Sequence, residues 1–473
     1  MQNIDYKRIS FLFFFFSLTL LLFLPHFMAR PMFLDGVTYA TIARNMSEGI
    51  GNFWFPQYTC LRNEPFHIQP PLAFGLNSIL FRIFGDADWV EKVYSYLTLC
   101  VSLFLITRLW HFFTKSLTLA GLPLLLWLLT PIVAWCYRNN MLENTVNVFA
   151  LASILFQLTA TEKANITQKA SPLALAALFL LAGFLTKGLV ALFPLATLPL
   201  YYFTVKKGSF RELFQSLALF LACFLVLILL LVFLQAAALE NLKAYFTAVN
   251  KMLHEKTTDT HLFMLYRLLQ ESLVTVAFFL FAWIVTKRKQ ISRPIHKESL
   301  FLFFMACAAS LPMMISLRQS QYYVMPAMIY VALGAALWIR PIVLFIWEKI
   351  THFQLHLWNL LNLLLLGVAL FLSYQQKDAL LYAHETFEDV QKISKIHPSR
   401  KVLKACYQLE TAYELKAYLY RYHHITLDTD LYNEIKPDTV LLPNYEGCSF
   451  IDMPTYEQAN LGLKKYHLYV KKK

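Results

Sequence analysis

Five ionisable side chains stand at the edges of apolar segments, where their types and spacing could support chemistry at a membrane surface. They are Asp35, Arg138, Glu143, Lys187 and Arg318. An ionisable residue at such a position is costly, so each is a functional candidate by default. Cations can stabilise an anionic leaving group, and a carboxylate can act as the base toward an acceptor hydroxyl. Two acids and three bases at one membrane face would therefore suit the transfer of a group from a lipid-linked phosphate.

Each of these five side chains also has a purely structural explanation. Asp35 could cap the short amphipathic helix that follows it. Glu143 and Arg138 could form an ordinary interfacial ion pair. Lys187 and Arg318 could reach from helix ends to the membrane surface, as long cationic side chains commonly do. Their shared side of the membrane is what favours the functional interpretation.

Three histidines complete the set of candidates. His67 precedes a double proline, and a lone histidine there is more often structural than catalytic. His254 and His261 lie seven residues apart on an outer loop that we expect to be helical, so they would share a face. Two histidines without an acid make a weak metal site. The sequence leaves open whether a divalent metal ion takes part.

The composition predicts a polytopic helical membrane protein. Of the 473 residues, 58% are hydrophobic and 15% are charged, whereas soluble domains average about 25% charged residues. The apolar residues form runs long enough to cross a bilayer. We expect about eleven transmembrane helices, near 9–27, 92–113, 117–135, 144–160, 170–186, 188–205, 213–236, 265–286, 299–316, 321–339 and 355–374. Residues 341–350 are too short to cross and are expected to form an interfacial turn.

The distribution of charge orients these spans. If Lys7 and Arg8 are cytoplasmic, the other loops rich in lysine and arginine also fall inside, as the positive-inside tendency requires. The net charge of +13 then needs no nucleic-acid partner. The same arrangement places the loop 28–91, all the candidate residues and the tail 375–473 on the outer side.

The tail differs in pattern from the rest of the chain. Short strands are expected at 402–406, 426–427, 439–442 and 466–470, with an amphipathic helix at 410–421. Alternating strand and helix signals predict a small α/β domain. The expected organisation is a transmembrane domain, 1–374, followed by a soluble extracytoplasmic domain, 375–473.

Five motifs resemble those of the polytopic lipid-linked-sugar glycosyltransferases of the GT-C fold. The chain looks most like family 39, the protein O-mannosyltransferases and their bacterial relatives, with the lipid A aminoarabinose transferases nearby. The matching stretches cover most of residues 9–340 in the family's order and are 35–46 (DGVTYATIARNM), 69–72 (QPPL), 138–143 (RNNMLE), 185–188 (LTKG) and 318–326 (RQSQYYVMP).

The resemblance implies a role for each candidate residue. Asp35 would be the base toward the acceptor hydroxyl, and Glu143 the second acid held near it. Lys187, Arg318 and Arg138 would contact the phosphate of a polyprenyl-phosphate sugar. Lipid, glycan or protein would accept the sugar on the non-cytoplasmic side, with inversion at the anomeric carbon. The small external tail favours a bacterial inner-membrane protein.

Two departures from the family pattern concern the first outer loop. Many relatives carry a second acid directly after the first, where this chain has Gly36. Many also have glutamate followed by lysine or histidine before the double proline, where this chain has Ile68-Gln69. His67 is therefore a substitute candidate for contacting the donor phosphate in this loop.

Two other classes of function fit parts of the sequence. A transporter or flippase of a lipid-linked or anionic substrate would place its charges near mid-membrane and show inverted repeats. Here the charges lie at one edge, and no repeat is visible. The second class is a non-catalytic scaffold of glycosyltransferase ancestry, and its only support is the two departures from the family pattern.

Overall fold

The computed structural model describes residues 2–59, 65–205, 208–289, 297–397, 402–430, 438–444 and 453–472. The chain divides into two compact units. The first comprises Met1–Phe27, His67–Ala73 and Val93–Gln375, and the second comprises Met28–Phe66, Phe74–Lys92 and Gln376–Lys473.

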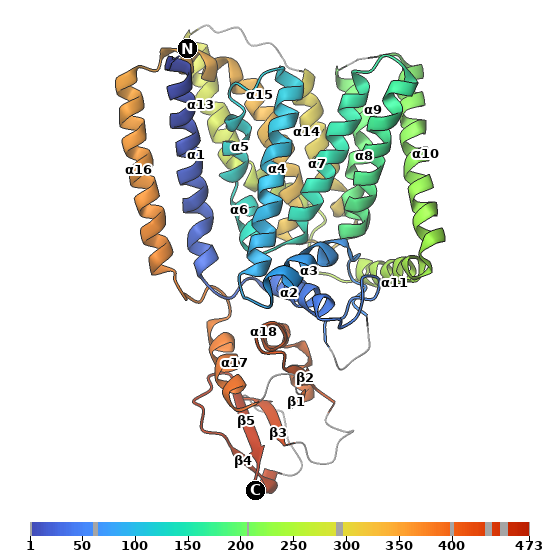
Figure 1. Cartoon of the computed structure of the whole chain (residues 1–473), viewed down its shortest axis with the longest axis vertical. Coiled ribbons are helices and arrows are strands. Elements are labelled where there is room, and N and C mark those ends of the chain that lie inside the picture. Colours follow the sequence, from blue (N-terminus) through green and yellow to red (C-terminus); the bar gives the residue numbers. More distant parts are fainter. Residues whose placement is uncertain are drawn as a thin grey trace. The chain divides into compact units, whose positions relative to one another are not determined.

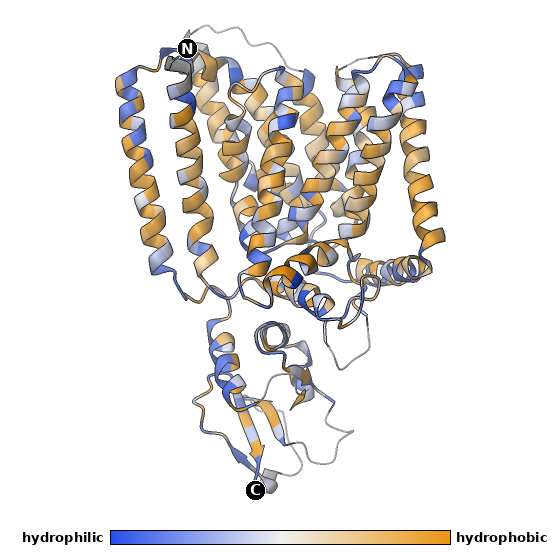
Figure 2. Cartoon of the chain, viewed as in Figure 1, coloured by the Kyte–Doolittle hydropathy of each residue, from blue (hydrophilic) through white to orange (hydrophobic). Residues whose placement is uncertain are grey.

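The first unit is a bundle of helices (Figure 1). Figure 2 shows that these helices are hydrophobic over most of their length, as expected for segments surrounded by lipid or by other helices. Its elements are α1 (Gln2–Met28), α4 (Val90–Thr114), α5 (Gly121–Leu128), α6 (Pro131–Arg138), α7 (Leu142–Thr161), α8 (Ile166–Lys187), η1 (Gly188–Ala196), α9 (Thr197–Val205), α10 (Phe210–Leu234), α11 (Ala236–Leu253), α12 (Phe263–Glu271), α13 (Leu273–Lys289), α14 (Lys297–Ser310), η2 (Leu311–Ile315), η3 (Gln321–Val324), α15 (Met325–Lys349) and α16 (His352–Gln375).

The helices of the described part of the chain match the expected spans. Eight are long and apolar enough to cross a membrane, and two bent pairs, α5 with α6 (78°) and α12 with α13 (49°), raise the number to as many as ten. One of the eight is the 40-residue stretch Ile166–Val205, about twice the length of one crossing.

That stretch reverses direction at Gly188. A Cβ atom at Gly183 would lie 3.6 Å from the Cβ of Ala191, although residues eight apart in a straight helix are separated by about 12 Å. If this stretch makes two crossings and each bent pair makes one, the described residues hold up to eleven crossings, in line with the expected number. The interfacial turn expected at 341–350 is wrong, because α15 continues through Pro341 to Lys349.

The second unit combines the first outer loop with the tail. Its helices are α2 (Leu34–Ser47), α3 (Leu72–Phe84), α17 (His384–Ile396) and α18 (Tyr413–His423). The five strands are β1 (Val402–Ala405), β2 (Thr426–Asp428), β3 (Thr439–Pro443), β4 (Tyr456–Gln458) and β5 (Tyr466–Lys471). They form one sheet in the order β2-β1-β3-β5-β4. β1 is parallel to β2 and β3, whereas β5 is antiparallel to β3 and β4. The expected α/β tail is confirmed.

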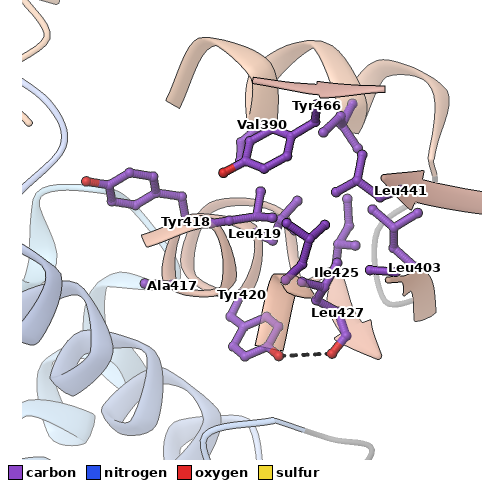
Figure 3. Close-up of a cluster of buried hydrophobic side chains, with 14 of the residues drawn as sticks. Val390, Leu403, Ala417, Tyr418, Leu419, Tyr420, Ile425, Leu427, Leu441 and Tyr466 are labelled. Atoms are coloured by element: carbon purple, nitrogen blue, oxygen red, sulfur yellow. Dashed lines mark hydrogen bonds between the residues drawn. The ribbon is translucent and has the colours of Figure 1, made fainter. Parts of the chain in front are cut away.

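One hydrophobic core holds the second unit together. Figure 3 shows Val390 of α17, Leu419 of α18 and Leu403 of β1 converging between the two helices and the sheet. Met32 and Val37 of the first outer loop belong to the same cluster. Residues from both ends of the chain therefore share one core. The expected division into a transmembrane domain, 1–374, and a soluble extracytoplasmic domain, 375–473, stays a prediction.

Candidate active site

The ends of α7 and α8 bring Glu143 and Lys187 into contact. Asn140, with φ 50°, turns the chain sharply between α6 and α7, a conformation that asparagine tolerates better than most residues. Glu143 then falls in the first turn of α7 and Lys187 at the last residue of α8, the ends that favour negative and positive charge respectively. Lys187 Nζ donates a hydrogen bond to Glu143 Oε1, and their side chains are only 6% and 2% exposed.

Aromatic rings complete the surroundings of Lys187. Its Nζ lies 5.3 Å from the ring centroid of Tyr322 and 4.8 Å from that of Tyr323, both in η3. Trp135 of α6 stacks on Tyr322 with the ring planes 11° apart. The ring faces attract the ammonium group. One carboxylate and two rings therefore hold the side chain of Lys187 at the end of α8.

The residue after Lys187 has to be glycine. Gly188 has φ 68° and ψ −139°, a region of backbone space used almost only by glycine. A Cβ atom there would lie 1.7 Å from the hydroxyl oxygen of Tyr245. That hydroxyl accepts a hydrogen bond from the Leu189 N–H at 3.2 Å. The Lys-Gly motif thus ends α8 and lets Tyr245 of α11 pack against the turn.

The two arginines have contacts of their own. Arg138 Nε donates to the backbone oxygen of Leu22 at 2.8 Å. Arg318 Nη1 pairs with Glu255, and both side chains are partly exposed, by 30% and 49%. The sequence places both arginines at segment ends, and the structure agrees. Their contacts to the donor phosphate stay predictions.

Contacts to other segments of the chain are seen for His67 and His261, and the metal role considered for His254 and His261 stays a prediction. His67 Nδ1 lies 3.2 Å from Asn241 Nδ2, and burial lowers the pKa of His67. The shared helical face expected for His254 and His261 is wrong, because α11 ends at Leu253. The intervening backbone instead turns toward the segment before Arg318, where Leu317 O accepts from the N–H groups of residues 257 and 258. His261 Nδ1 lies 2.7 Å from Met314 O.

Asp35 lies in the first turn of α2, in the second compact unit. The N-cap is Phe33, so the capping role considered for Asp35 is not the one observed, although the start of a helix favours its negative charge. Thr38 Oγ1 donates to the hydroxyl of Tyr58 at 3.5 Å. Burial raises the pKa of Tyr58, and the nearby carboxylate of Asp35 adds to this rise. A half-buried carboxylate and a protonated phenol therefore lie close together.

The structure also reveals a buried acid that lies outside the sequence motifs. Glu271 of α12 is 6% exposed and accepts hydrogen bonds from the Ile132 N–H at 3.0 Å and from Arg267 Nη2 at 2.7 Å. Glu271 therefore holds the start of α6, the second helix of the bent pair α5 and α6, which ends at Arg138. The signal was an arginine and a glutamate four residues apart inside an apolar run.

Among the described residues, one group of possible metal ligands lies close enough together to hold an ion. It consists of Glu48, Asp86 and His424. Asp86 Oδ1 already accepts from Arg421 at 2.6 Å, and His424 Nε2 lies 2.8 Å from Asp86 Oδ2. These partners satisfy the carboxylate without a cation. The chemistry of this group therefore does not favour a metal site.

Known proteins resemble the chain in part of its sequence and in its fold. Residues 68–235 match the family model of dolichyl-phosphate-mannose-protein mannosyltransferases, a segment that contains Glu143 and Lys187. A search of curated proteins gave no match. The structure of ArnT from Cupriavidus metallidurans bound to undecaprenyl phosphate is similar, with 14% identity and a TM-score of 0.67, covering 99% of this chain and 97% of ArnT. The apo structure of ArnT gives a TM-score of 0.63 at the same identity and coverage.

The architecture expected from the sequence motifs is thus confirmed. The chain is a multi-pass membrane protein with the GT-C fold of the membrane glycosyltransferases.

Proposed function

We propose that the chain is a glycosyltransferase that moves a sugar from a polyprenyl-phosphate donor to an acceptor on the non-cytoplasmic side of the membrane. The observation that carries this proposal is the buried Glu143–Lys187 pair, enclosed by Tyr322 and Tyr323. The fold and the match of residues 68–235 support it. The family match places the pair inside the segment shared with mannosyltransferases.

Stability alone does not explain why the Glu143–Lys187 pair is buried. A buried ion pair often contributes no more than well-packed apolar residues would, and ionisable groups at the edge of a membrane span are expensive. Lys187 is held by a single carboxylate oxygen in the contact described and by two ring faces. A donor phosphate that reaches the ammonium could therefore replace Glu143 as its partner without moving the helices.

The proposed reaction is a direct displacement. Asp35 takes the proton of the acceptor hydroxyl, whose oxygen attacks the anomeric carbon. The bond from that carbon to the phosphate oxygen breaks, and the polyprenyl phosphate leaves with the electron pair. Cations must neutralise this leaving group. We assign that role to Lys187, with Arg318, Arg138 and His67 as further contacts, and we assign Glu143 to holding Lys187 in place.

The comparisons support the proposed donor class, and the distribution of charge supports the proposed location. ArnT was crystallised with undecaprenyl phosphate, so a polyprenyl phosphate is the carrier proposed here. The acceptor is a lipid, a glycan or a protein. We further propose that the site and the tail face the outside of a bacterial inner membrane, and the lysines and arginines of the expected cytoplasmic loops support this orientation. No divalent metal ion is assigned.

A transporter of lipid-linked substrates is less well supported. Such proteins bind their substrates near mid-membrane. Glu143 lies in the first turn of α7 and Lys187 at the last residue of α8, so this pair lies at helix ends.

The test uses the purified full-length protein in lipid nanodiscs with a panel of polyprenyl-phosphate sugars. Release of free polyprenyl phosphate together with transfer of the sugar to an acceptor is the expected result. Lys187→Met should weaken donor binding about 10- to 150-fold, the value of one hydrogen bond to a charged group. The matched control is Lys115→Met, since Lys115 forms an exposed pair with Glu162, and its activity should equal that of the wild type.

Two outcomes would contradict the proposal. One is equal loss of donor binding in the Lys187 and Lys115 variants. The other is movement of labelled donor across a liposome membrane without release of polyprenyl phosphate, which would instead support a flippase.

A further inference from the structure

Arg421 is a fully buried cation in the second unit. Its side chain, on α18, is 1% exposed. A buried charge is tolerated only when it is paired and hydrogen-bonded. Its Nε and Nη2 donate to the two carboxylate oxygens of Glu91 at 3.2 and 2.8 Å, and Glu91 is itself 0% exposed. This two-pronged geometry is specific to a guanidinium and a carboxylate.

The remaining donors of Arg421 reach the same segment. Its Nη1 donates to Asp86 at 2.6 Å and its Nη2 to the backbone oxygen of Ala87 at 3.1 Å. Asp86 and Ala87 lie between α3 and α4, and Glu91 lies in the first turn of α4. Burial works to lower the pKa of Arg421, but Glu91 and Asp86 outweigh it and raise the pKa above its usual value. The arginine is therefore permanently charged, and its partners lie about 330 residues earlier in the chain.

A second buried arginine extends the contact to α2. Arg44 Nη1 donates to the backbone oxygen of Arg421 at 2.8 Å and lies 3.8 Å from Asp86. Arg44 is in the last turn of α2, and Asp35 is in its first turn. Nine residues of helix separate them by about 14 Å. Because a helix is a stiff element, holding one end at Arg44 restrains the other.

The start of α2 is held by the tail as well. Val37 is 0% exposed and belongs to the same hydrophobic cluster as Phe387 and Val390 of α17. The ring of Tyr58 meets that of Tyr420 at 4.9 Å. The helix that carries Asp35 is thus anchored at both ends to the C-terminal residues.

From these contacts we infer that Arg421 is a positioning residue for sugar transfer and that the tail serves to hold α2, and with it Asp35, in place. This inference rests on the proposed function, in which Asp35 is the base. Arg421 touches neither donor nor acceptor in this scheme. It acts through the ion pairs with Glu91 and Asp86, which hold α18 in place, and α18 in turn holds the end of α2 through Arg44.

The experiment compares Arg421→Met and Arg421→Lys with the wild type in the full-length protein. Hydrogen exchange measured by mass spectrometry reports on α2 directly. Arg421→Met should raise the exchange of the α2 amides at least tenfold and lower kcat at least tenfold, with little change in the KM for donor. Arg421→Lys, which keeps the charge but loses the two-pronged geometry, should fall between. The control is Arg30→Met, because Arg30 forms an exposed pair with Asp88 in the same unit, and both readouts should stay at wild-type values.

Each contrary result has a distinct meaning. Unchanged exchange in Arg421→Met would overturn the anchoring, and faster exchange with unchanged kcat would overturn the positioning role. If Arg421→Met does not fold, Asp86→Asn, which removes the half-exposed partner, should give the same changes to a smaller degree, and its failure to do so overturns the inference. If the wild type turns over no donor, the proposed function fails, and the exchange data alone then decide the anchoring.

Discussion

Adding one methyl group at Gly188 should destabilise the bundle and displace Lys187. The backbone of Gly188, with φ 68° and ψ −139°, would cost an alanine about 1–3 kcal/mol. The new Cβ would also lie 1.7 Å from the hydroxyl oxygen and 2.2 Å from Cζ of Tyr245, whereas non-bonded carbons prefer about 3.5–4 Å. One of the two groups must therefore move by more than about 1 Å, and such overpacking costs about 1–3 kcal/mol. The expected total for Gly188→Ala is about 2–6 kcal/mol.

Two further variants separate the backbone cost from the steric cost. Gly49 has φ 81° with no atom within 4 Å of an added Cβ, so Gly49→Ala should show the backbone cost alone, about 1–2 kcal/mol. Tyr245→Ala removes the group that collides with the methyl. The double variant Gly188→Ala/Tyr245→Ala should therefore be more stable than the sum of the single changes predicts, by about 1–3 kcal/mol.

Unfolding in detergent micelles, followed by tryptophan fluorescence, measures these differences, and donor KM reports the displacement of Lys187. Gly188→Ala should unfold at milder conditions than Gly49→Ala and should raise the KM. If the two glycine variants unfold alike, or if the double variant shows no coupling, the packing of Tyr245 against Gly188 is refuted as the reason for the motif.

Two other predictions use the same unfolding assay. Lys187→Met removes the ammonium that pairs with the buried Glu143 carboxylate, and it should lower the free energy of unfolding by about 3–5 kcal/mol. Adding Glu143→Leu should restore most of that free energy, because no buried charge is then left without its partner. A double variant that is no more stable than Lys187→Met would contradict this prediction. Burial lowers the pKa of His423 below 6.5, so the folded state resists a protonation that the unfolded state accepts. The free energy of unfolding that depends on neutral His423 is therefore fully present above about pH 6.5 and is lost as the pH falls below that value. His423→Gln should therefore reduce the loss of unfolding free energy between about pH 7.5 and 5. If the variant loses as much stability over this range as the wild type, His423 is not the source of the pH dependence.

The membrane part of the fold could be predicted because its signal is local. A bilayer crossing needs about 20 apolar residues in a row, and the expected runs correspond to the observed helices. The end of α15 was missed since a proline normally stops a helix, yet Pro341 lies within it. In the tail, α17 was overlooked although Phe387, Val390 and Ile393 repeat every three residues, a helical spacing.

The site could be predicted only in part. Helix ends placed Glu143 and Lys187 on one side of the membrane, but their direct pairing depends on how α7 and α8 pack. The contact between Arg421 and Glu91 joins residues 330 positions apart, and no pattern in a single sequence signals it. The histidines show the opposite case: a seven-residue spacing predicts a shared helical face, but α11 ends at Leu253, and the backbone that follows it donates hydrogen bonds to Leu317 O.

Asp35→Asn tests the central claim most directly. The asparagine keeps the size of the side chain and its place in the first turn of α2 but cannot take up a proton from the acceptor. The matched control is Glu385→Gln, which removes the first-turn acid of α17 without touching the proposed base. With folding and donor binding intact, Asp35→Asn should lower sugar transfer about 10²- to 10⁴-fold, the usual contribution of general base catalysis, while Glu385→Gln keeps wild-type transfer. Transfer by Asp35→Asn within a few-fold of the wild type would contradict the account and leave Asp35 as a stabilising charge at a helix start.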